Sequence, residues 1–164
     1  MSLDIQKMPA CIDRAIKNAF KVQLSSNCSV AQLTMKADPQ KIGPIDCLST
    51  IMLQSTKLAG SLSIGFSKLT FLAVLAKMIG ESMPEITSEN CDASSELLNI
   101  IYGQARKEIN ELGFDFQLAI PSTVIGTTLA IAKNNLSGQV LYFNCKSELG
   151  EFVVVLSLKI KNLD

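Results

Sequence analysis

Hydrophobic residues recur along the chain with two different periods, and these periods predict where helices and strands lie. Apolar residues return every three or four positions over 9–22, 68–79 and 88–112, which is the spacing of one buried helix face. They return every second position over 31–37 and 114–120, which is typical of a strand with one buried face. The pattern therefore predicts a chain that mixes helices with strands.

Short apolar runs between turn signals predict further strands. The runs CLSTIMLQS and LAGSLSIGF are separated by a tight connection around Thr56 and Lys57, and they are typical of a β-hairpin. The sequence SSNCSV, by contrast, is a loop signal. Three more strands are expected at 127–133, 139–146 and 151–161.

The order of these elements predicts the fold class. A helix, three strands and a second helix are followed by a third helix and three or four strands, which suggests two pseudo-repeated α-plus-three-strand halves. Strands joined by short turns pair antiparallel. We therefore expect an α+β fold with an antiparallel β-sheet and α-helices packed on one face, in a single domain spanning residues 1–164.

Composition excludes several classes of function. Fifteen basic residues balance 15 acidic ones, so nothing in the charge indicates a nucleic acid or an anionic membrane surface as partner. The chain has no histidine, which excludes histidine-based catalysis and His-ligated zinc. No apolar run approaches a membrane span, no signal peptide is recognisable, and the five cysteines lack a C-x-x-C spacing. These features predict a cytoplasmic protein with free thiols.

The helix predicted over 88–112 carries the candidate site. Glu96 and Asn99 lie three positions apart, so their side chains project from the same face, away from the apolar stripe. Gly103 lies one turn further on. A glycine inside a helix costs about 1 kcal/mol relative to alanine, so we expect a reason for it. Either a binding partner approaches the backbone closely there, or the helix packs against a neighbouring element.

The ends of this helix also carry recognisable signals. Ser88 or Asp92 is suited to cap its N-terminus, and Gly113 is suited to end it. Ser94 and Ser95 could suggest a nucleophile, but no histidine or other paired base accompanies them. Capping of the helix explains these two serines better.

The run that begins at Glu96 resembles the CheC/CheX family of chemotaxis phosphatases. The matching motif positions are Glu96, Leu97, Asn99, Gly103, Ala105, Gly113, Pro121 and Gly126. Members of the CheC kind carry two Glu-x-x-Asn helices, whereas the first helix of this chain, CIDRAIKNAF, has no such pair. The likeness is therefore to the CheX-like branch, which has a single motif.

The resemblance implies a phosphatase that dephosphorylates the aspartyl-phosphate of a phosphorylated response regulator. The Asn99 amide would hold a water in line with the phosphorus, Glu96 would meet the regulator's active-site lysine, and Gly103 would allow the partner to come close. Phosphoryl transfer passes through a loose transition state with little need for a general base, so positioning the water can supply much of the acceleration. The protein would need no cofactor of its own, because Mg²⁺ would belong to the partner, and it would form a homodimer by pairing sheets across a two-fold axis.

Two other functions compete with this one. Related domains of flagellar switch proteins are non-catalytic and serve protein contacts, and a purely structural dimerisation domain would make the pair incidental. The intact Glu96 and Asn99 favour the phosphatase.

Overall fold

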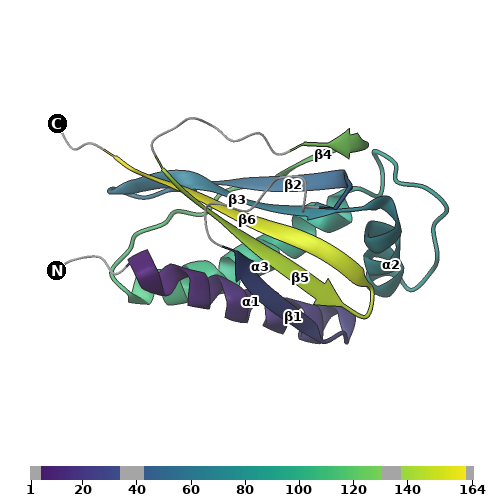
Figure 1. The fold of residues 1–164 in the computed structure, drawn as a ribbon, viewed down its shortest axis with the longest axis horizontal. Helices are drawn as coiled ribbons and strands as arrows, with labels where there is room; N and C mark the ends of the chain where they lie inside the picture. Colours follow the sequence, from purple (N-terminus) through teal and green to yellow (C-terminus); the bar gives the residue numbers. More distant parts are fainter. Residues whose placement is uncertain (1–4, 34–42, 131–137, 162–164) are drawn as a thin grey trace.

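A computed structural model describes residues 5–33, 43–130 and 138–161 of the chain (Figure 1). A short 3₁₀ turn, Ile5–Lys7, precedes three helices: α1 (Met8–Leu24), α2 (Lys68–Ile79) and α3 (Asp92–Glu111). The strands are β1 (Cys28–Leu33), β2 (Ile45–Gln54), β3 (Leu58–Phe66), β4 (Ser122–Leu129), β5 (Gln139–Ser147) and β6 (Gly150–Ile160).

The six strands form one antiparallel sheet in the order β1-β5-β6-β3-β2-β4. The order reads the same from either edge when β1 is exchanged with β4, β2 with β5, and β3 with β6. The pseudo-two-fold axis of this exchange runs between β3 and β6, where Leu62 lies opposite Leu156. The topology confirms the two α-plus-three-strand halves.

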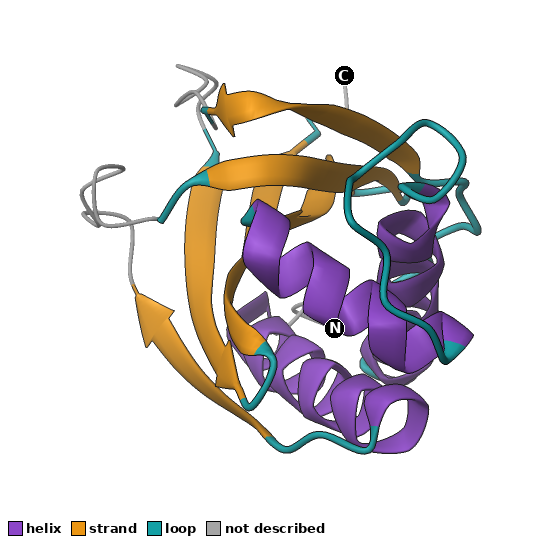
Figure 2. Ribbon diagram, turned by 90° about the vertical axis from the view of Figure 1, so that its right-hand side faces the viewer, coloured by secondary structure: helices purple, strands orange, loops and turns teal. Residues whose placement is uncertain are grey.

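All three helices lie on the same face of the sheet, and the strands curve around them (Figures 1 and 2). The main core fills the space between these two layers. Phe20 of α1 stacks on Phe152 of β6 with ring centroids 4.4 Å apart, and Phe66 of β3 packs beside the same ring at 5.4 Å. Aromatic side chains bury a large apolar area, so this cluster fixes the helices on the sheet. The predicted α+β class is confirmed.

Residues 114–120 correct one prediction, because they form no strand. The alternation holds for Phe114 and Phe116, which are buried, but it fails at Leu118 and Ile120, which are exposed. The segment returns along α3, and helix side chains rather than a full strand ladder bind much of its backbone. Alternation alone does not distinguish this arrangement from a strand.

Two strand boundaries also differ from those predicted. The loop predicted for SSNCSV is wrong in its second half, because Cys28 already begins β1. The second part of the strand expected over 31–37 lies outside the described residues. Strand β4 begins at Ser122, directly after Pro121, whereas we expected a strand over 127–133. Residues 131–133 of that prediction lie outside the described part of the chain. Strand β4 pairs with β2 at the edge of the sheet.

The helix ends follow the predictions only in part. Helix α2 has the predicted bounds, and its N-cap Ser67 accepts a hydrogen bond from the backbone N–H of Thr70. Helix α3 starts after Cys91 without a side-chain cap, so the predicted capping by Ser88 or Asp92 is wrong. Gly113 follows the last turn of α3 with φ +93°, a left-handed conformation that glycine adopts without strain.

Candidate active site on helix α3

The outer face of α3 carries the predicted site residues. With about 100° of rotation per residue, Glu96, Asn99 and Gly103 fall within an arc of about 60°. All three are exposed. The structure thus places on one open surface the three residues that we singled out from the helical spacing, the motif and the unusual glycine.

The opposite face of α3 anchors the helix in the core. Its fully buried apolar residues are Leu97, Leu98, Ile101, Ala105 and Ile109. This stripe was predicted from the three- and four-residue spacing. Because the helix is held by a packed core, the Glu96 and Asn99 backbones occupy a fixed position relative to the sheet.

Helix α1 runs antiparallel along one side of α3. Asn18 donates its side-chain N–H to Oε1 of Gln104 at 3.0 Å, and Nε of Arg14 donates to Oε2 of Glu108 at 2.9 Å. Both pairs lie at the surface. The border of the site toward α1 is therefore polar and charged.

The returning segment after Gly113 forms the other border. Tyr102 donates its hydroxyl to the carbonyl of Gln117 at 2.6 Å. The Asn110 side chain accepts a hydrogen bond from the backbone N–H of Phe116 at 2.9 Å and donates to the carbonyl of the same residue at 3.1 Å. These two helix residues were not singled out from sequence, because spacing along a helix gives no indication of the partners of a polar side chain.

A chain of hydroxyl groups joins the first turn of α3 to the sheet beneath it. Ser49 of β2 donates to Oγ of Ser94 at 2.8 Å, and its own oxygen lies 2.7 Å from Oγ1 of Thr123 in β4. Ser94 therefore anchors the helix rather than capping it. Ser95 also does not cap, because its hydroxyl donates to the carbonyl of Asp92 within the helix. Our explanation of both serines as caps was wrong.

Gly103 faces open space. A Cβ added to this residue would meet nothing within 4 Å among the described residues. Packing against a neighbouring element was one of our two explanations for this glycine, and the geometry excludes it. What remains is a flat, open stretch of helix surface one turn beyond Asn99.

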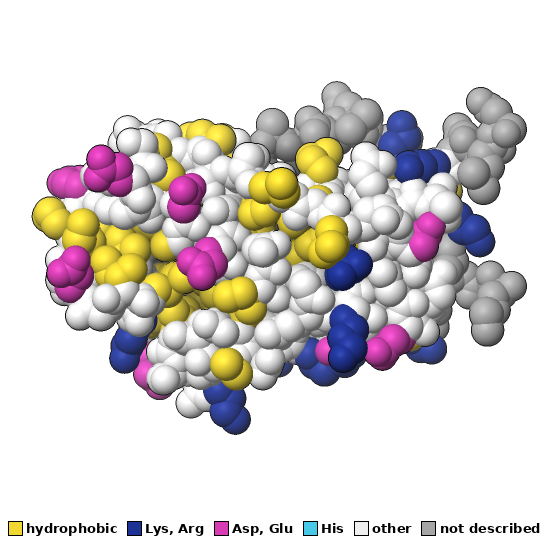
Figure 3. Space-filling view, turned by 180° about the vertical axis from the view of Figure 1, so that it is seen from behind, with side chains coloured by type: hydrophobic (Ala, Val, Ile, Leu, Met, Phe, Trp, Pro, Cys, Tyr) yellow, Lys and Arg dark blue, Asp and Glu magenta, His cyan; other side chains and the backbone are white. Residues whose placement is uncertain are grey.

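Charge is distributed unevenly along this face of the molecule. Glu85, Glu89, Asp92 and Glu96 are all exposed around the start of α3, and Lys107 is exposed beyond Gly103. In Figure 3 the acidic side chains near the connection between α2 and α3 lie among hydrophobic ones, and basic side chains gather toward the other end. Acidic groups near a helix N-terminus are stabilised by the helix dipole. Glu85 is paired with Lys68, so Glu89, Asp92 and Glu96 give the site its negative border.

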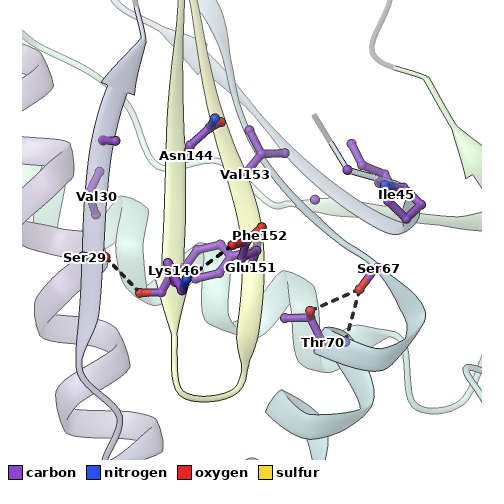
Figure 4. A pocket seen from close by; sticks show the side chains of 14 residues that line it. Ser29, Val30, Ile45, Ser67, Thr70, Asn144, Lys146, Glu151, Phe152 and Val153 are labelled. Atoms are coloured by element: carbon purple, nitrogen blue, oxygen red, sulfur yellow. Dashed lines mark hydrogen bonds and ion pairs between the residues drawn. The ribbon is translucent and has the colours of Figure 1, made fainter. Parts of the chain in front are cut away.

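The site residues Glu96, Asn99 and Gly103 are exposed on the surface of α3. A cavity of about 650 Å³ opens instead between β1, β5, β6 and the start of α2, where Ser29, Lys146 and Thr70 contribute to its lining (Figure 4). No residue of α3 lines it. Small-molecule substrates are usually bound in concave sites, so an exposed pair on a helix is better suited to a macromolecular substrate.

In the described ranges, no group of three or more acidic or cysteine side chains is arranged to hold a metal ion. Within the same ranges, no helix is long and apolar enough to cross a membrane.

A family model described as the chemotaxis phosphatase CheX matches residues 49–144, more than half of the chain. The chain belongs to the CheX family. The matched span contains α3 with Glu96, Asn99 and Gly103, and also the segment that borders the site. The resemblance found in the motif is thus confirmed, and the CheX family is one of chemotaxis phosphatases.

Solved structures show the same fold. The chemotaxis protein CheX from Desulfovibrio desulfuricans is 25% identical, with a TM-score of 0.79 over 94% of this chain and 99% of that one. CheX from Vibrio vulnificus is 23% identical, with a TM-score of 0.84 over 93% and 99%. A complex of CheX with CheY, BeF₃ and Mg²⁺ from Borrelia burgdorferi is 16% identical, with a TM-score of 0.66 over 93% and 97%. No curated protein matches the sequence.

Proposed function

We propose that this CheX-family protein hydrolyses the aspartyl-phosphate of a phosphorylated response regulator. The observation that carries the proposal is the exposed Glu96–Asn99 pair on a helix whose other face is fully buried. The open surface at Gly103 supports it, because a folded partner can approach the helix backbone there. Membership of a family of chemotaxis phosphatases supports the reaction class.

In the proposed reaction, a water oxygen attacks phosphorus and the bond from phosphorus to the aspartyl oxygen breaks. The products are inorganic phosphate and a free carboxylate, and the proton lost by the water ends on the phosphate. The Asn99 amide orients the attacking water, which supplies acceleration because the transition state is loose and depends mainly on positioning. An amide takes no proton at neutral pH, so Asn99 is not a general base.

Glu96 has the second role in this proposal. Its exposed carboxylate forms an ion pair with the active-site lysine of the regulator, and this pair sets the orientation of α3 on the partner. The Mg²⁺ expected in the reaction belongs to the receiver domain. The Borrelia CheX solved with CheY, BeF₃ and Mg²⁺ supports a regulator as the partner, since it has the same fold.

The homodimer remains part of the proposal. Strand β4 is an edge strand whose Val124 and Ile125 side chains are 54% and 39% exposed. Exposed apolar edge strands favour pairing with another chain. Two copies that pair their sheets would present two sites per dimer, in the cytoplasm, where response regulators are found.

Incubation of the purified protein with a phosphorylated receiver domain tests the function. We expect loss of the aspartyl-phosphate to be faster than the intrinsic rate of the receiver, in proportion to the amount of protein added. Binding without acceleration would instead indicate the non-catalytic interaction domain of the flagellar switch type. Neither binding nor acceleration would indicate a structural domain.

A further inference from the structure

Two of the five cysteines lie side by side at the β1 edge of the sheet, opposite the edge made by β4. Cys28 is the first residue of β1 and pairs with Ser147 of β5. Cys145 lies two positions before Ser147 in the same strand. Cys28 and Cys145 are therefore diagonal neighbours across the strand pair, on the same face of the sheet. Cys145 belongs to the main core, and Cys28 packs against the same cluster.

The two thiols are in contact, and they differ in exposure. The Cys145 thiol has two hydrogen-bond acceptors within reach, which are the sulfur of Cys28 and the carbonyl of Phe143 at 3.4 Å. Cys145 is 2% exposed, whereas Cys28 is half-exposed. A small molecule in solution therefore reaches Cys28 first, and Cys145 lies directly behind it in the core.

The surroundings of Cys28 favour its thiolate. The hydrogen bond from Cys145 lowers the pKa of Cys28 most, and the backbone N–H of Lys146 acts in the same direction, while burial opposes both. From α1, Lys17 lowers this pKa and Asp13 raises it. These two charges partly offset each other, because Lys17 donates to the Asp13 carboxylate at 2.8 Å. Since the thiolate is the nucleophilic form, an oxidant attacks Cys28 first.

We propose that Cys28 and Cys145 form a reversible disulfide when the protein meets hydrogen peroxide. The Cys28 thiolate attacks one peroxide oxygen, the O–O bond breaks, and the released hydroxide takes up a proton to become water. The Cys145 sulfur then attacks the sulfenic sulfur of Cys28. The S–O bond breaks, and the oxygen leaves with the thiol proton as a second water. Two thiols are thus oxidised to one disulfide while one peroxide is reduced to two waters.

The position of the pair suits a bond that forms and is reduced again. A disulfide needs Cβ atoms about 3.8 Å apart, and diagonal neighbours in a sheet lie further apart than this. Cys28 begins an edge strand directly after the turn that follows α1, so this end of β1 can move toward β5 without disturbing the central strands. A disulfide formed with such strain is more easily reduced. Transient disulfides of this kind are typical of redox-sensing proteins.

Mass spectrometry of the full chain tests the proposal. The protein is treated with hydrogen peroxide, its remaining thiols are blocked with N-ethylmaleimide in denaturant, and its peptides are separated without reductant. We expect the peptides of Cys28 and Cys145 to be linked with the loss of two hydrogens, and dithiothreitol to release them. Cys47 and Cys91 are the internal control, because burial raises the pKa of both. These two thiols should remain free to react with N-ethylmaleimide.

Two variants separate the roles of the pair. In Cys145→Ala the sulfenic acid of Cys28 has no thiol beside it, so dimedone should trap at least tenfold more of it than in the wild type. Cys28→Ser should leave Cys145 unoxidised. A melting curve must show that each variant is folded, and the peptide linkage in the wild type decides the proposal independently of them.

Three results would overturn the proposal. The first is a Cys28 that peroxide leaves unmodified in the wild type. The second is a disulfide that joins Cys28 to another cysteine or to a second copy of the chain. The third is an equal dimedone adduct on Cys28 in the wild type and in Cys145→Ala, because Cys145 would then not react with the sulfenic acid.

Discussion

Ser49 of β2 donates a hydrogen bond to Ser94 of α3 at 2.8 Å, and both side chains are fully buried. Since the single hydroxyl hydrogen of Ser49 goes to Ser94, Thr123 of β4 must donate to Ser49 across their 2.7 Å contact. One small side chain thus joins two strands to the first turn of the site helix. This buried contact fixes the position and rotation of that turn relative to the sheet, on the side of α3 that faces the core.

Ser49→Ala should destabilise the protein by about 1–3 kcal/mol, because it leaves the buried Ser94 hydroxyl without this donor. Urea denaturation measures the loss. Ser63→Ala is the control: its partner Thr50, 2.8 Å away, is only half-buried, and water replaces the lost bond there. The control should cost less than about 0.5 kcal/mol. Equal losses in the two variants would contradict the anchoring role of Ser49.

Gly103→Ala should have opposite effects on stability and on function. Nothing within the chain obstructs a Cβ at this position, so the helix should gain about 1 kcal/mol. If a partner approaches the backbone here, KM for the phosphorylated receiver should rise. Lys107→Ala, exposed one turn further along the same helix, serves as control for the surface change. A stabilised variant with wild-type KM would show that the open surface serves no partner.

Glu96→Ala and Asn99→Ala should affect different kinetic constants. Glu96 orients the partner, so its loss should mainly raise KM, whereas Asn99 orients the attacking water, so its loss should mainly lower kcat. Steady-state dephosphorylation of a receiver domain separates the two effects. If both variants are as active as the wild type, α3 does not carry the site.

Asn99→Asp keeps the size of the side chain and replaces its neutral amide by a carboxylate. If Asn99 only orients water, the added negative charge repels the phosphoryl group and activity should collapse at neutral pH. If the site instead needs a proton acceptor, activity should persist and rise with pH through the titration of the carboxylate. A melting curve must show that the variant is folded. Full activity in the folded variant would refute the water-positioning mechanism.

The cysteines should differ in reactivity because their pKa values move in opposite directions. A hydrogen bond from the Cys145 thiol lowers the pKa of the half-exposed Cys28, whereas burial raises the pKa of Cys47 from 9.0 to about 11. At pH 8, iodoacetamide should therefore label Cys28 first and Cys47 very slowly, as followed by peptide mass spectrometry. Cys28→Ser should remove the fast phase.

The pKa of Cys47 also has a consequence for stability. Because the folded-state pKa lies above the ordinary value, its contribution is fully present below about pH 9 and is lost as the pH rises toward 11. Stability measured by urea denaturation in that range should fall less steeply in Cys47→Ala than in the wild type. Parallel curves for the two proteins would contradict this assignment.

The sequence by itself determined the elements whose signals are local. Apolar spacing in α3 gave its buried stripe and the outward direction of Glu96 and Asn99, because a helix repeats every 3.6 residues wherever it lies. The element order gave the two-half sheet, and the motif beginning at Glu96 gave the family. Gly113 gave the end of α3, because a left-handed residue after a helix has a local energetic cause.

Only the tertiary structure decided what borders the site. The alternation over 114–120 is the same in a strand and in an extended segment held by helix side chains, so Tyr102 and Asn110 became visible as partners of that segment only in three dimensions. From the sequence, Ser94 likewise resembles a helix cap, and only the structure shows that its partner is Ser49 of β2. Hydrogen bonds between groups far apart in sequence depend on how the elements pack. No residue pattern along the chain shows which of these groups come within hydrogen-bond distance of one another.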